Sequence, residues 1–531
     1  MYKTLQFLPA GSNKFIVELE DLESTISLCD ALKTACFEGV KEVVPGAVTL
    51  HVSYDPFVTT ARELYAQISS LRPQAGLSRA GDLVEIPMVY DGEDLAFVAD
   101  YLGWSVEQLI RRHQAATFTV AFTGFAPGFA YMTCDDPELD VPRRDSPRVR
   151  IPAGSVALAG RFCGVYPSDT PGGWQLLGAT VVPMWDVSRK QAALLKPGDR
   201  VRFVEAAAHQ TADSVVKADP ALHASQGKGF RVVATDRPIL FQDLGRAGNA
   251  HQGVSQSGAA DLNALRLANE LLGNSDTAVA MEVTYGGAVF EAEMPLTVTV
   301  TGAAVPLALT SADGRVISIP CSAPVALNAG DTLALGVPSH GVRSYVALRG
   351  GLVAPQILGS ASTDTLAKVG PEPITSGAVM QLADDVCGSV CAQPIEEPTL
   401  PAGTDVVVLD VVMGPRTDWF TPEAIRTFTE QAWKVTPESN RVGVRLNGAS
   451  ALTRECADEL PSEGTSRGSI QVPRNGQPVL FLADHPLTGG YPVIAVVAEH
   501  HLSLAAQIPI GARIRFNAIA GFDPQVKETE R

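Results

Sequence analysis

The sequence predicts a mainly β protein of several domains, preceded by a small N-terminal α+β module. Three observations lead to this fold class. From about residue 81 onward, short β-rich runs alternate with turn residues, and the chain contains 47 Gly and 37 Pro. The helices expected in that part are brief. A glycine-rich motif and the alternating strand that follows it also recur along the chain.

The composition limits the classes of partner. The 531 residues are 46% hydrophobic and 19% charged, which suits several buried cores. A net charge of −17 argues against binding to nucleic acid or to an anionic membrane. We find neither a membrane-length apolar run nor a signal-peptide pattern. Because the eight cysteines are scattered, we expect a cytoplasmic protein without a disulfide framework.

The first 80 residues combine strands with helices. Residues 15–19 and 47–54 read as strands, and residues 21–40 and 59–71 show helical spacing of apolar side chains. We therefore expect an α+β module at 1–80.

Two segments without regular periodicity divide the rest of the chain into β units. Brief helices are expected at 94–102 and 105–114. Ala-, Ser- and Pro-rich segments without periodicity mark the linkers. The expected boundaries are a β unit at 81–205, a linker at 206–229, a β unit at 230–387, a linker at 388–404 and a β unit at 405–531.

An internal repeat suggests that some of these units are related. Residues 151–178 and 472–494 each contain a Pro-Gly turn, Pro-x-Gly at 152–154 and Pro-x-x-Gly at 473–476, followed by Gly-Gly and an aromatic residue. Each copy then reaches a similar strand, KPGDRVRF at 196–203 and PIGARIRF at 509–516. A third such strand is AGDTLAL at 329–335. The pattern favours duplicated β domains, although a Gly-Asp turn before a strand is also common in unrelated β proteins.

Familiar enzyme signatures are absent from the sequence. It has no nucleotide-binding glycine loop, no metalloprotease motif, no nucleophile elbow and no biotin-acceptor motif. Cys387 and Cys391 have no second pair of ligands nearby, and adjacent His500 and His501 do not share a helix face. We therefore predict no metal site.

Two segments of the first half could line a binding pocket. Residues 124–131 (GFAPGFAY) place three aromatic rings around a turn whose backbone Gly and Pro restrict. A tight turn with core aromatics explains the same pattern equally well. Arginines between 143 and 150 would suit an anionic ligand, or a solvated loop.

The second half offers weaker signals. Residues 242–246 (QDLGR) lead to Ser257, which we expect to cap a helix at 259–272 that ends at Gly273. An ordinary capped helix leaves the pair Asp243 and Arg246 unexplained. Asp484 and His485, ahead of residues 488–491, place a carboxylate and an imidazole near a flexible loop.

Taken together, these motifs resemble the allophanate-hydrolase subunit 1 and subunit 2 families, joined in one chain. Subunit 1 is matched by GFAPGFAY at 124–131, PRR at 142–144, PAGS at 152–155, YP at 166–167 and PGGWQLLG at 171–178. Subunit 2 is matched by QDLGR at 242–246, GVSQSGAAD at 253–261, AN at 268–269, GA at 302–303, YVALRGG at 345–351, GSAST at 359–363, GP at 414–415, RVGVRL at 441–446, IQVP at 470–473 and TGGYP at 488–492. The resemblance implies multiple cyclophilin-like β-barrel domains, similar to the carboxyltransferase region of urea carboxylase.

The resemblance also implies a function. Stand-alone bacterial pairs of this type are components B and C of ATP-dependent 5-oxoprolinase, which act with a separate lactam-utilisation-type component A to convert 5-oxoproline to L-glutamate. The implied co-substrate is ATP with Mg²⁺, for which the sequence shows no site, and no biotin is attached to this chain. The alternatives are a biotin-dependent carboxyltransferase acting on urea or a related amide, and a regulatory protein of the histidine-kinase-inhibitor type. Whether the chain forms a homo-oligomer is left open.

On this basis we expect an active cleft where the two halves of the chain face each other. Asp243 or Asp484 would contact the substrate N–H, and Arg246, Arg441 and Arg445 would hold a carboxylate or phosphate. The small ring would pack on Phe125, Phe129 and Tyr131. The remaining expected binding residues are Gly172, Gly173, Trp174, Ser257 and Tyr491.

The sequence departs from the family pattern in two places. TLAKVGP at 365–371 stands where the family has a Gly-Gly segment, and DHPL at 484–487 stands where it has Asp-Arg-Gln-Thr. His485 thus replaces an arginine, a change that concerns anion binding and the substrate more than the fold.

Overall fold

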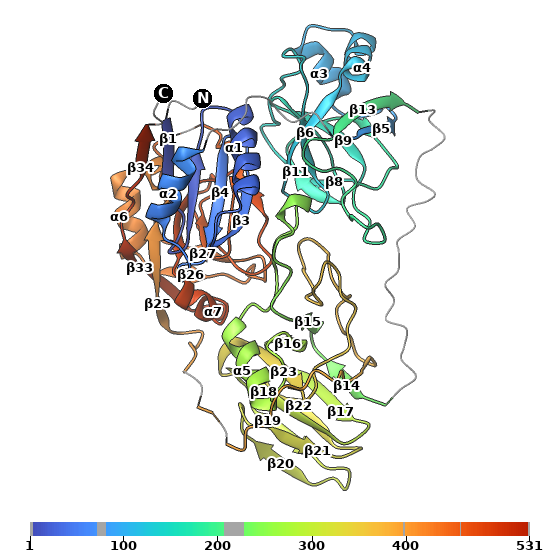
Figure 1. The fold of residues 1–531 in the computed structure, drawn as a ribbon. Helices are drawn as coiled ribbons and strands as arrows, with labels where there is room; N and C mark the ends of the chain where they lie inside the picture. The colour runs from blue at the N-terminus through green and yellow to red at the C-terminus, as the bar shows by residue number, and fades with distance from the viewer. Residues whose placement is uncertain are drawn as a thin grey trace.

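The computed structural model describes residues 4–71, 81–206 and 228–528, apart from 394, 397, 398 and 457. Figure 1 shows the N-terminal module beside the C-terminal barrel, with the unit at 81–205 and the unit at 230–387 as separate bodies next to them. The predominance of strands, with a small α+β unit at the N-terminus, confirms the predicted fold class. Residues 207–227 of the expected 206–229 linker lie outside the described residues.

The N-terminal module is one sheet covered by two helices. The sheet order is β3–β4–β2–β1–β34, and the helices are α1 and α2. Its elements are β1 (Thr4–Pro9), β2 (Lys14–Glu18), α1 (Leu22–Ala35), β3 (Val40–Pro45), β4 (Thr49–Tyr54), α2 (Ala61–Ser70) and β34 (Gln525–Glu528).

Local sequence explains where both helices of this module begin. The carboxylate of Asp21 accepts a hydrogen bond from the Ser24 N–H at the start of α1. Thr60 and Glu63 form a capping box at the start of α2. The strand that the sequence did not predict here is β34, which pairs antiparallel with β1 from the other end of the chain.

The unit after residue 81 forms a seven-stranded barrel-like sheet. Its order is β5–β13–β6–β7–β10–β9–β12, and an antiparallel bridge between Val89 and Ala179 joins the two edges. Its strands are β5 (Leu83–Met88), β6 (Phe118–Thr123), β7 (Ala130–Thr133), β9 (Ser155–Ala159), β10 (Phe162–Val165), β12 (Gln175–Ala179) and β13 (Arg200–Glu205). Helices α3 (Leu95–Tyr101) and α4 (Val106–Ala115) lie between β5 and β6 in the chain, where brief helices were predicted.

The C-terminal unit repeats this arrangement as a closed barrel. Its order is β25–β33–β26–β27–β30–β29–β32, closed by pairing of β32 with β25. Its strands are β25 (Val406–Met413), β26 (Trp433–Val435), β27 (Gly443–Asn447), β29 (Ser469–Gln471), β30 (Val479–Phe481), β32 (Val493–Val497) and β33 (Arg513–Ala520), and helix α6 (Pro422–Glu430) lies between β25 and β26. In both barrels the first and last strands pair in parallel while the other pairs are antiparallel. This common topology agrees with the duplication that the repeat predicts.

A two-stranded ribbon accompanies each barrel. β8 (Arg148–Ile151) pairs with β11 (Thr170–Gly172), and β28 (Glu463–Gly464) pairs with β31 (Thr488–Gly489). Each ribbon leads into a Gly-Gly-aromatic segment, so the repeated motif has the same structural setting in both copies.

The middle unit differs from a barrel. Between residues 230 and 387, where the resemblance leads us to expect a third barrel, the described strands form two sheets that enclose a shared core. One contains β14 (Phe230–Thr235), β17 (Ala288–Ala292), β19 (Leu307–Thr310), β20 (Val316–Ile319), β22 (Thr332–Leu335) and β24 (Val379–Met380). The other contains β15 (Leu240–Gln242), β16 (Ala280–Thr284), β18 (Leu296–Ala304), β21 (Val325–Leu327) and β23 (His340–Leu348), with helix α5 (Leu262–Leu272) packed on β18 and β23. The third copy of the repeated strand is β22, which pairs with β17 and β19 inside the first of these sheets.

Helix α5 begins later than predicted. Its N-cap is Asp261, whose carboxylate accepts from the Ala264 N–H, and Gly273 ends it in the left-handed conformation. Ser257 therefore does not cap this helix; its hydroxyl donates instead to Asp484. The remaining short elements are η2 (Ala250–Gln252), η3 (Thr417–Trp419), η4 (Glu499–His501) and α7 (Leu502–Ala505). No helix among the described residues is long and apolar enough to cross a membrane.

A buried ion pair fastens the N-terminal module to the C-terminal barrel. Arg416 donates to Glu463 at 2.9 Å and to Glu18 of β2 at 2.7 Å. Arg416 is 4% exposed and Glu463 is 1% exposed, so solvent cannot replace either partner. The N–H of Ala47 also donates to the carbonyl of Ser462, next to the β28 strand.

We expect Arg416→Met to lower the free energy of unfolding by about 3–5 kcal/mol, because it leaves the Glu463 carboxylate buried without a partner. Urea-induced unfolding of the full chain measures this change. The double variant Arg416→Met/Glu463→Gln should recover most of the loss, since the unpaired charge is removed. Lys41→Met, which breaks the surface pair with Asp55 at 3.1 Å, is the matched control and should cost at most about 1 kcal/mol. A loss at Arg416 no larger than that of the control would contradict a fastening role.

Candidate functional site

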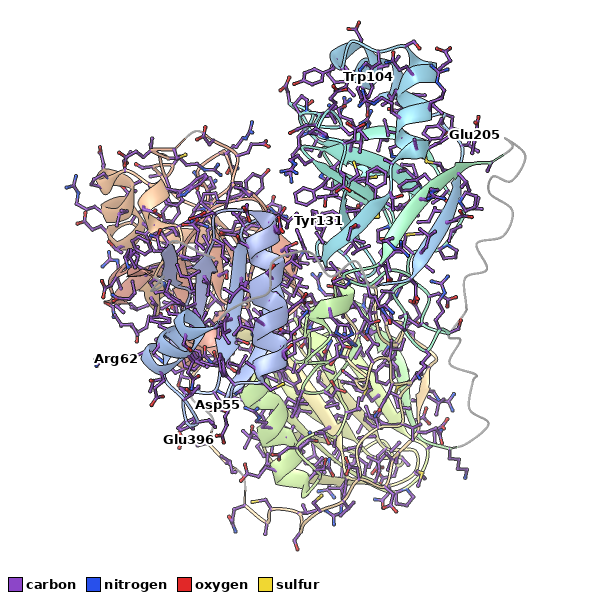
Figure 2. All side chains as sticks on the ribbon, turned by 45° about the horizontal axis from the view of Figure 1, so that its top comes forward. Asp55, Arg62, Trp104, Tyr131, Glu205 and Glu396 are labelled. Atoms are coloured by element: carbon purple, nitrogen blue, oxygen red, sulfur yellow. The ribbon has the colours of Figure 1, made fainter. Side chains whose placement is uncertain are left out.

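The two barrels face each other across a cleft of about 420 Å³. The repeated Gly-Gly-aromatic segments lie on opposite walls, Gly172–Trp174 on the first barrel and Gly489–Tyr491 on the C-terminal barrel. Figure 2 shows Tyr131 on the side of the first barrel that faces the N-terminal module and the C-terminal barrel. The side chains and backbone that line the cleft are Phe125, Phe129, Tyr131, Arg143, Arg144, Asp145, Pro147, Tyr166, Pro171, Gly172, Gly173, Trp174, Arg454, Asp458, Glu459, Ser462, Gln471, Arg474, Pro486, Thr488, Gly489, Gly490 and Tyr491.

Aromatic rings form one wall of the cleft. Phe129 meets Tyr131, Tyr166 and Trp174 edge-to-face, with ring centroids 5.0, 5.4 and 5.4 Å apart. Phe125 adds a further edge contact to Phe129 at 5.2 Å. Because these rings restrain one another, they form a rigid apolar surface against which a small flat ligand can pack.

The opposite barrel holds the turn that carries these rings. Phe125 has a φ of 65°, a left-handed conformation that is unusual for a bulky residue. Its N–H donates to Thr488 Oγ1 at 2.9 Å. A Cβ on Gly124 would lie 2.6 Å from the same oxygen, so this close approach requires glycine. The turn predicted from GFAPGFAY therefore belongs to the first barrel but also packs against the C-terminal barrel.

Four arginines lie around the cleft, and they differ in how their charge is balanced. Arg144 pairs with Asp94 at 2.6 Å, and Arg474 pairs with Glu459 at 2.9 Å. Arg454 donates to the carbonyl of Val472 and lies over the ring of Tyr491. Arg143, by contrast, makes no hydrogen bond or ion pair with any residue that the structure describes.

Like Tyr166, Tyr131 is a buried polar group of the aromatic wall. Burial raises the pKa of its phenol, although hydrogen bonds with Ser462 and Thr488 act in the opposite direction. The phenol therefore stays protonated at neutral pH and remains a hydrogen-bond donor.

The structure brings together only part of the residues expected at the site. Seven of them line the cleft: Phe125, Phe129, Tyr131, Gly172, Gly173, Trp174 and Tyr491. The other six lie away from the cleft lining: Asp243, Arg246, Ser257, Arg441, Arg445 and Asp484. Arg445 is exposed on β27. The remaining five are buried in a polar network between the middle unit and the C-terminal barrel.

Arg441 is the centre of that network. It donates to both carboxylate oxygens of Asp484 at 2.9 Å and to Glu282 at 2.7 Å. Burial alone would raise the pKa of Asp484, but the Arg441 guanidinium outweighs it and lowers the pKa. Asp484 also accepts from Ser257 at 2.8 Å and from the backbone and hydroxyl of Thr365. Through these hydrogen bonds Asp484 connects the segments that contain Ser257, Thr365 and Arg441.

Asp243 and Arg246 organise the loop that contains GSAST. The carboxylate of Asp243 accepts from the hydroxyls of Ser360 and Ser362 and from the N–H of Ala361. Arg246 donates to the carbonyl of Ser362 and is 2% exposed. These contacts fix one loop against another, and they leave Nη1 of Arg246 buried without a hydrogen-bond partner among the described residues.

Asp364 is a buried acid that the sequence did not single out. Its Oδ1 accepts from the N–H groups of Leu366 and Ala367, and it is 2% exposed. Burial, together with the nearby charge of Asp484, raises the pKa of Asp364 to about 7.

His485 stands near the cleft floor as a neutral ring. Its Nδ1 contacts the carbonyl of Pro486 at 2.9 Å, and burial lowers its pKa to about 4. At neutral pH the imidazole therefore adds no positive charge where the family pattern has arginine.

Several cleft residues were missed as site residues from the sequence. Tyr166 and Thr488 stand inside quoted motifs, so the motif itself was the available signal, whereas Arg143 belongs to the arginine cluster for which the sequence suggests an anionic ligand or a solvated loop. Arg454, Gln471 and Arg474 carry no such local signal, because only the closure of the second barrel brings them to the first.

Comparison with known proteins matches both parts of the chain. The carboxyltransferase domain, subdomains C and D, matches residues 5–195, and subdomains A and B match residues 252–518. The C subunit of Escherichia coli 5-oxoprolinase is 36% identical over 290 residues, 54% of this chain and 90% of that protein. The B subunit of Bacillus subtilis 5-oxoprolinase is 36% identical over 185 residues, 32% of this chain and 76% of that protein.

Two solved structures are also similar to this chain, one of them over nearly its whole length. The crystal structure of TTHA0988 superposes with a TM-score of 0.81 at 33% identity and covers 95% of this chain and 99% of that one. The K. lactis urea amidolyase superposes with a TM-score of 0.51 at 30% identity, over 55% of this chain and 19% of that one.

Two barrels of one topology facing each other across a cleft define a carboxyltransferase-type domain pair. The chain belongs to the carboxyltransferase-domain family, with subdomains A to D in one polypeptide and relatives among the B and C subunits of 5-oxoprolinase.

The raised pKa of Asp364 predicts a pH-dependent stability. The folded state holds this proton more tightly than the unfolded chain, so the contribution of Asp364 to stability should fall as pH rises from about 4 through about 7. Asp364→Asn cannot ionise and should match the wild type near pH 4 but exceed it near pH 8, by a few kcal/mol at most. Urea unfolding at both pH values measures the difference.

Asp169→Asn is the matched control, with the opposite sign. The N–H of Ala153 and the guanidinium of Arg150 lower the pKa of Asp169, so this variant should lose stability at pH 8 and, since the carboxylate ionises below its ordinary pKa, still lose most of it near pH 4. If Asp364→Asn and the wild type differ equally at both pH values, Asp364 does not hold a proton in the folded protein.

Proposed function

We propose that the chain is the B/C component of an ATP-dependent 5-oxoprolinase, which opens the lactam of 5-oxoproline to L-glutamate together with a separate component A. The observation that carries this proposal is a cleft in which an aromatic wall lies beside an arginine without a partner among the described residues. The names of the related proteins support it.

The chemistry of the substrate fits this wall and its charges. 5-Oxoproline is a small flat ring that carries a carboxylate and an amide. The ring packs on Phe129 and Trp174, whose orientations are restrained by edge-to-face contacts with each other and with neighbouring rings. Arg143 binds the carboxylate, because it is the cleft arginine whose hydrogens no described residue occupies.

The amide end of the substrate then lies near the polar groups of the wall. The protonated phenol of Tyr131 donates a hydrogen bond to the lactam oxygen. Gln471 and Thr488 of the C-terminal barrel provide further polar atoms at this end. Since residues of both barrels contact one small ring, binding orders the reacting amide relative to both walls.

An unactivated amide resists attack by water, so the reaction requires a second input. In this proposal ATP with Mg²⁺ is a co-substrate that phosphorylates the amide oxygen and makes its carbon electrophilic. We assign no residue of this chain to ATP. Conversion of 5-oxoproline to L-glutamate therefore requires component A in addition to this chain.

Carboxyl transfer to urea is the second candidate, because the superposition with urea amidolyase spans 55% of this chain. Urea is a smaller amide without a carboxylate. An arginine free to bind a carboxylate in the cleft therefore favours the lactam acid over urea.

The proposal predicts glutamate and ADP release from 5-oxoproline and Mg-ATP only when this chain and a purified component A are both present. Coupled enzymatic assays measure both products. A component A shown to be active with its own B and C partners controls for the quality of that protein. Absence of turnover with it would sink the lactam hypothesis, and carboxylation of urea by a biotin carboxylase and carrier would be tested next.

Arg143→Gln should raise the KM for 5-oxoproline about 10- to 100-fold with a smaller change in kcat, since it removes a charge-assisted contact made before and during the reaction. Arg143→Lys should recover part of the loss. Arg202→Gln, which removes an exposed arginine of β13 near Glu85, is the matched control and should leave KM unchanged. An unaltered KM in Arg143→Gln would remove the carboxylate contact from the proposal.

A further inference from the structure

A cluster of one carboxylate and two imidazoles lies on the C-terminal barrel, away from the cleft. Asp410 Oδ2 lies 3.0 Å from His500 Nε2 and 3.9 Å from His501 Nδ1. The three potential ligand atoms all lie within 4.8 Å of one another. We propose that Asp410, His500 and His501 form a structural binding site for Zn²⁺.

The two histidines converge for a reason that the sequence does not show. They occupy the 3₁₀ turn η4, and their rings lie 4.3 Å apart. Asp410 comes from the neighbouring strand β25 and faces both rings. The sequence predicts no metal site, because adjacent histidines do not share a helix face and Cys387 and Cys391 have no further ligands nearby. Asp410 reaches the histidines only because β25 pairs with β32 in the barrel.

The donor set suits this metal. Zn²⁺ binds imidazole nitrogen and carboxylate oxygen in a tetrahedral arrangement, and a water can complete three protein ligands. The side chain of His500 is 59% exposed, which leaves an open path for the ion and its water. The cluster contains a single carboxylate, so it is not a general acidic patch that would attract Ca²⁺ or Mg²⁺.

The surroundings orient the ligands. Asn517 Nδ2 donates to Asp410 Oδ1 at 2.7 Å, which fixes the carboxylate and leaves Oδ2 toward the histidines. His501 Nδ1 accepts from the backbone N–H of Asp410 at 2.9 Å, so this nitrogen carries a lone pair and no proton. On binding, Zn²⁺ replaces that N–H as the partner of the lone pair. At His500 Nε2 the ion replaces the proton, which moves to Nδ1 or to solvent.

The site lies at a junction of three units. Glu499, the residue before His500, pairs with Lys14 of the N-terminal module at 3.8 Å. Just after the turn, Ser503 of α7 accepts from the Asn263 N–H of α5 in the middle unit. Figure 1 shows α7 next to α5, between the C-terminal barrel and the middle unit. A metal that ties η4 to β25 therefore stabilises the position of both neighbouring units relative to the barrel.

Zinc titration of the full-length, tag-free, EDTA-treated protein tests the proposal. Isothermal titration calorimetry with ZnCl₂ should show one ion per chain, and the melting temperature should rise with Zn²⁺. His500→Gln and Asp410→Asn should each weaken binding about tenfold or more and abolish the rise in melting temperature. His251→Gln, which removes an exposed histidine far along the chain, is the matched control and should behave as the wild type.

Three outcomes would overturn the proposal. They are no binding by the wild type, weak binding of several equivalent ions, and one-to-one binding that survives in both His500→Gln and Asp410→Asn. Melting without metal shows whether the variants fold, and His500 is exposed enough for its substitution to be tolerated. The measurement is independent of 5-oxoprolinase turnover, so failure here leaves the proposed function untouched.

Discussion

The burial of Arg441 constrains how the second half of the chain assembles. A guanidinium at 5% exposure needs carboxylate partners, and these come from Glu282 in the middle unit and Asp484 in the C-terminal barrel. Removing either partner would leave a charge in an apolar setting, so these ion pairs stabilise the orientation in which the two units are docked. That orientation places Pro486 and Thr488, just beyond Asp484, against the first barrel, where they complete the cleft.

The cleft is a product of duplication. One barrel topology occurs twice, and each copy carries a two-stranded ribbon that leads to Gly-Gly and an aromatic residue. The copies face each other with these segments opposed, yet their surroundings differ. The first barrel contributes a cluster of rings, whereas the C-terminal barrel contributes Gln471, Arg454 and Arg474. A ligand without symmetry, with an apolar ring and distinct polar ends, suits two such unequal walls.

Residues whose role depends on neighbours in the chain could be predicted from the sequence, and those whose role depends on distant partners could not. The helix starts at Asp21 and Thr60, the aromatic turn at 124–131 and the repeated motif are all local patterns. Asp243, Arg246 and Asp484 looked like ligand-binding groups because charged residues in glycine-rich loops often are. Their partners within the protein, such as Ser360 and Arg441, lie far away in sequence and become neighbours only in the folded chain. For the same reason the sequence did not predict that β34 completes the sheet of the N-terminal module.

The pairing of β34 with β1 has a consequence for how the protein is made. The sheet of the N-terminal module receives its last strand from residues Gln525–Glu528, which leave the ribosome after every barrel strand has been synthesised. Until then β1 presents an open edge to other chains in the cell. The first module to be synthesised is thus the one whose sheet is completed last, so its folding depends on contacts of very high sequence separation.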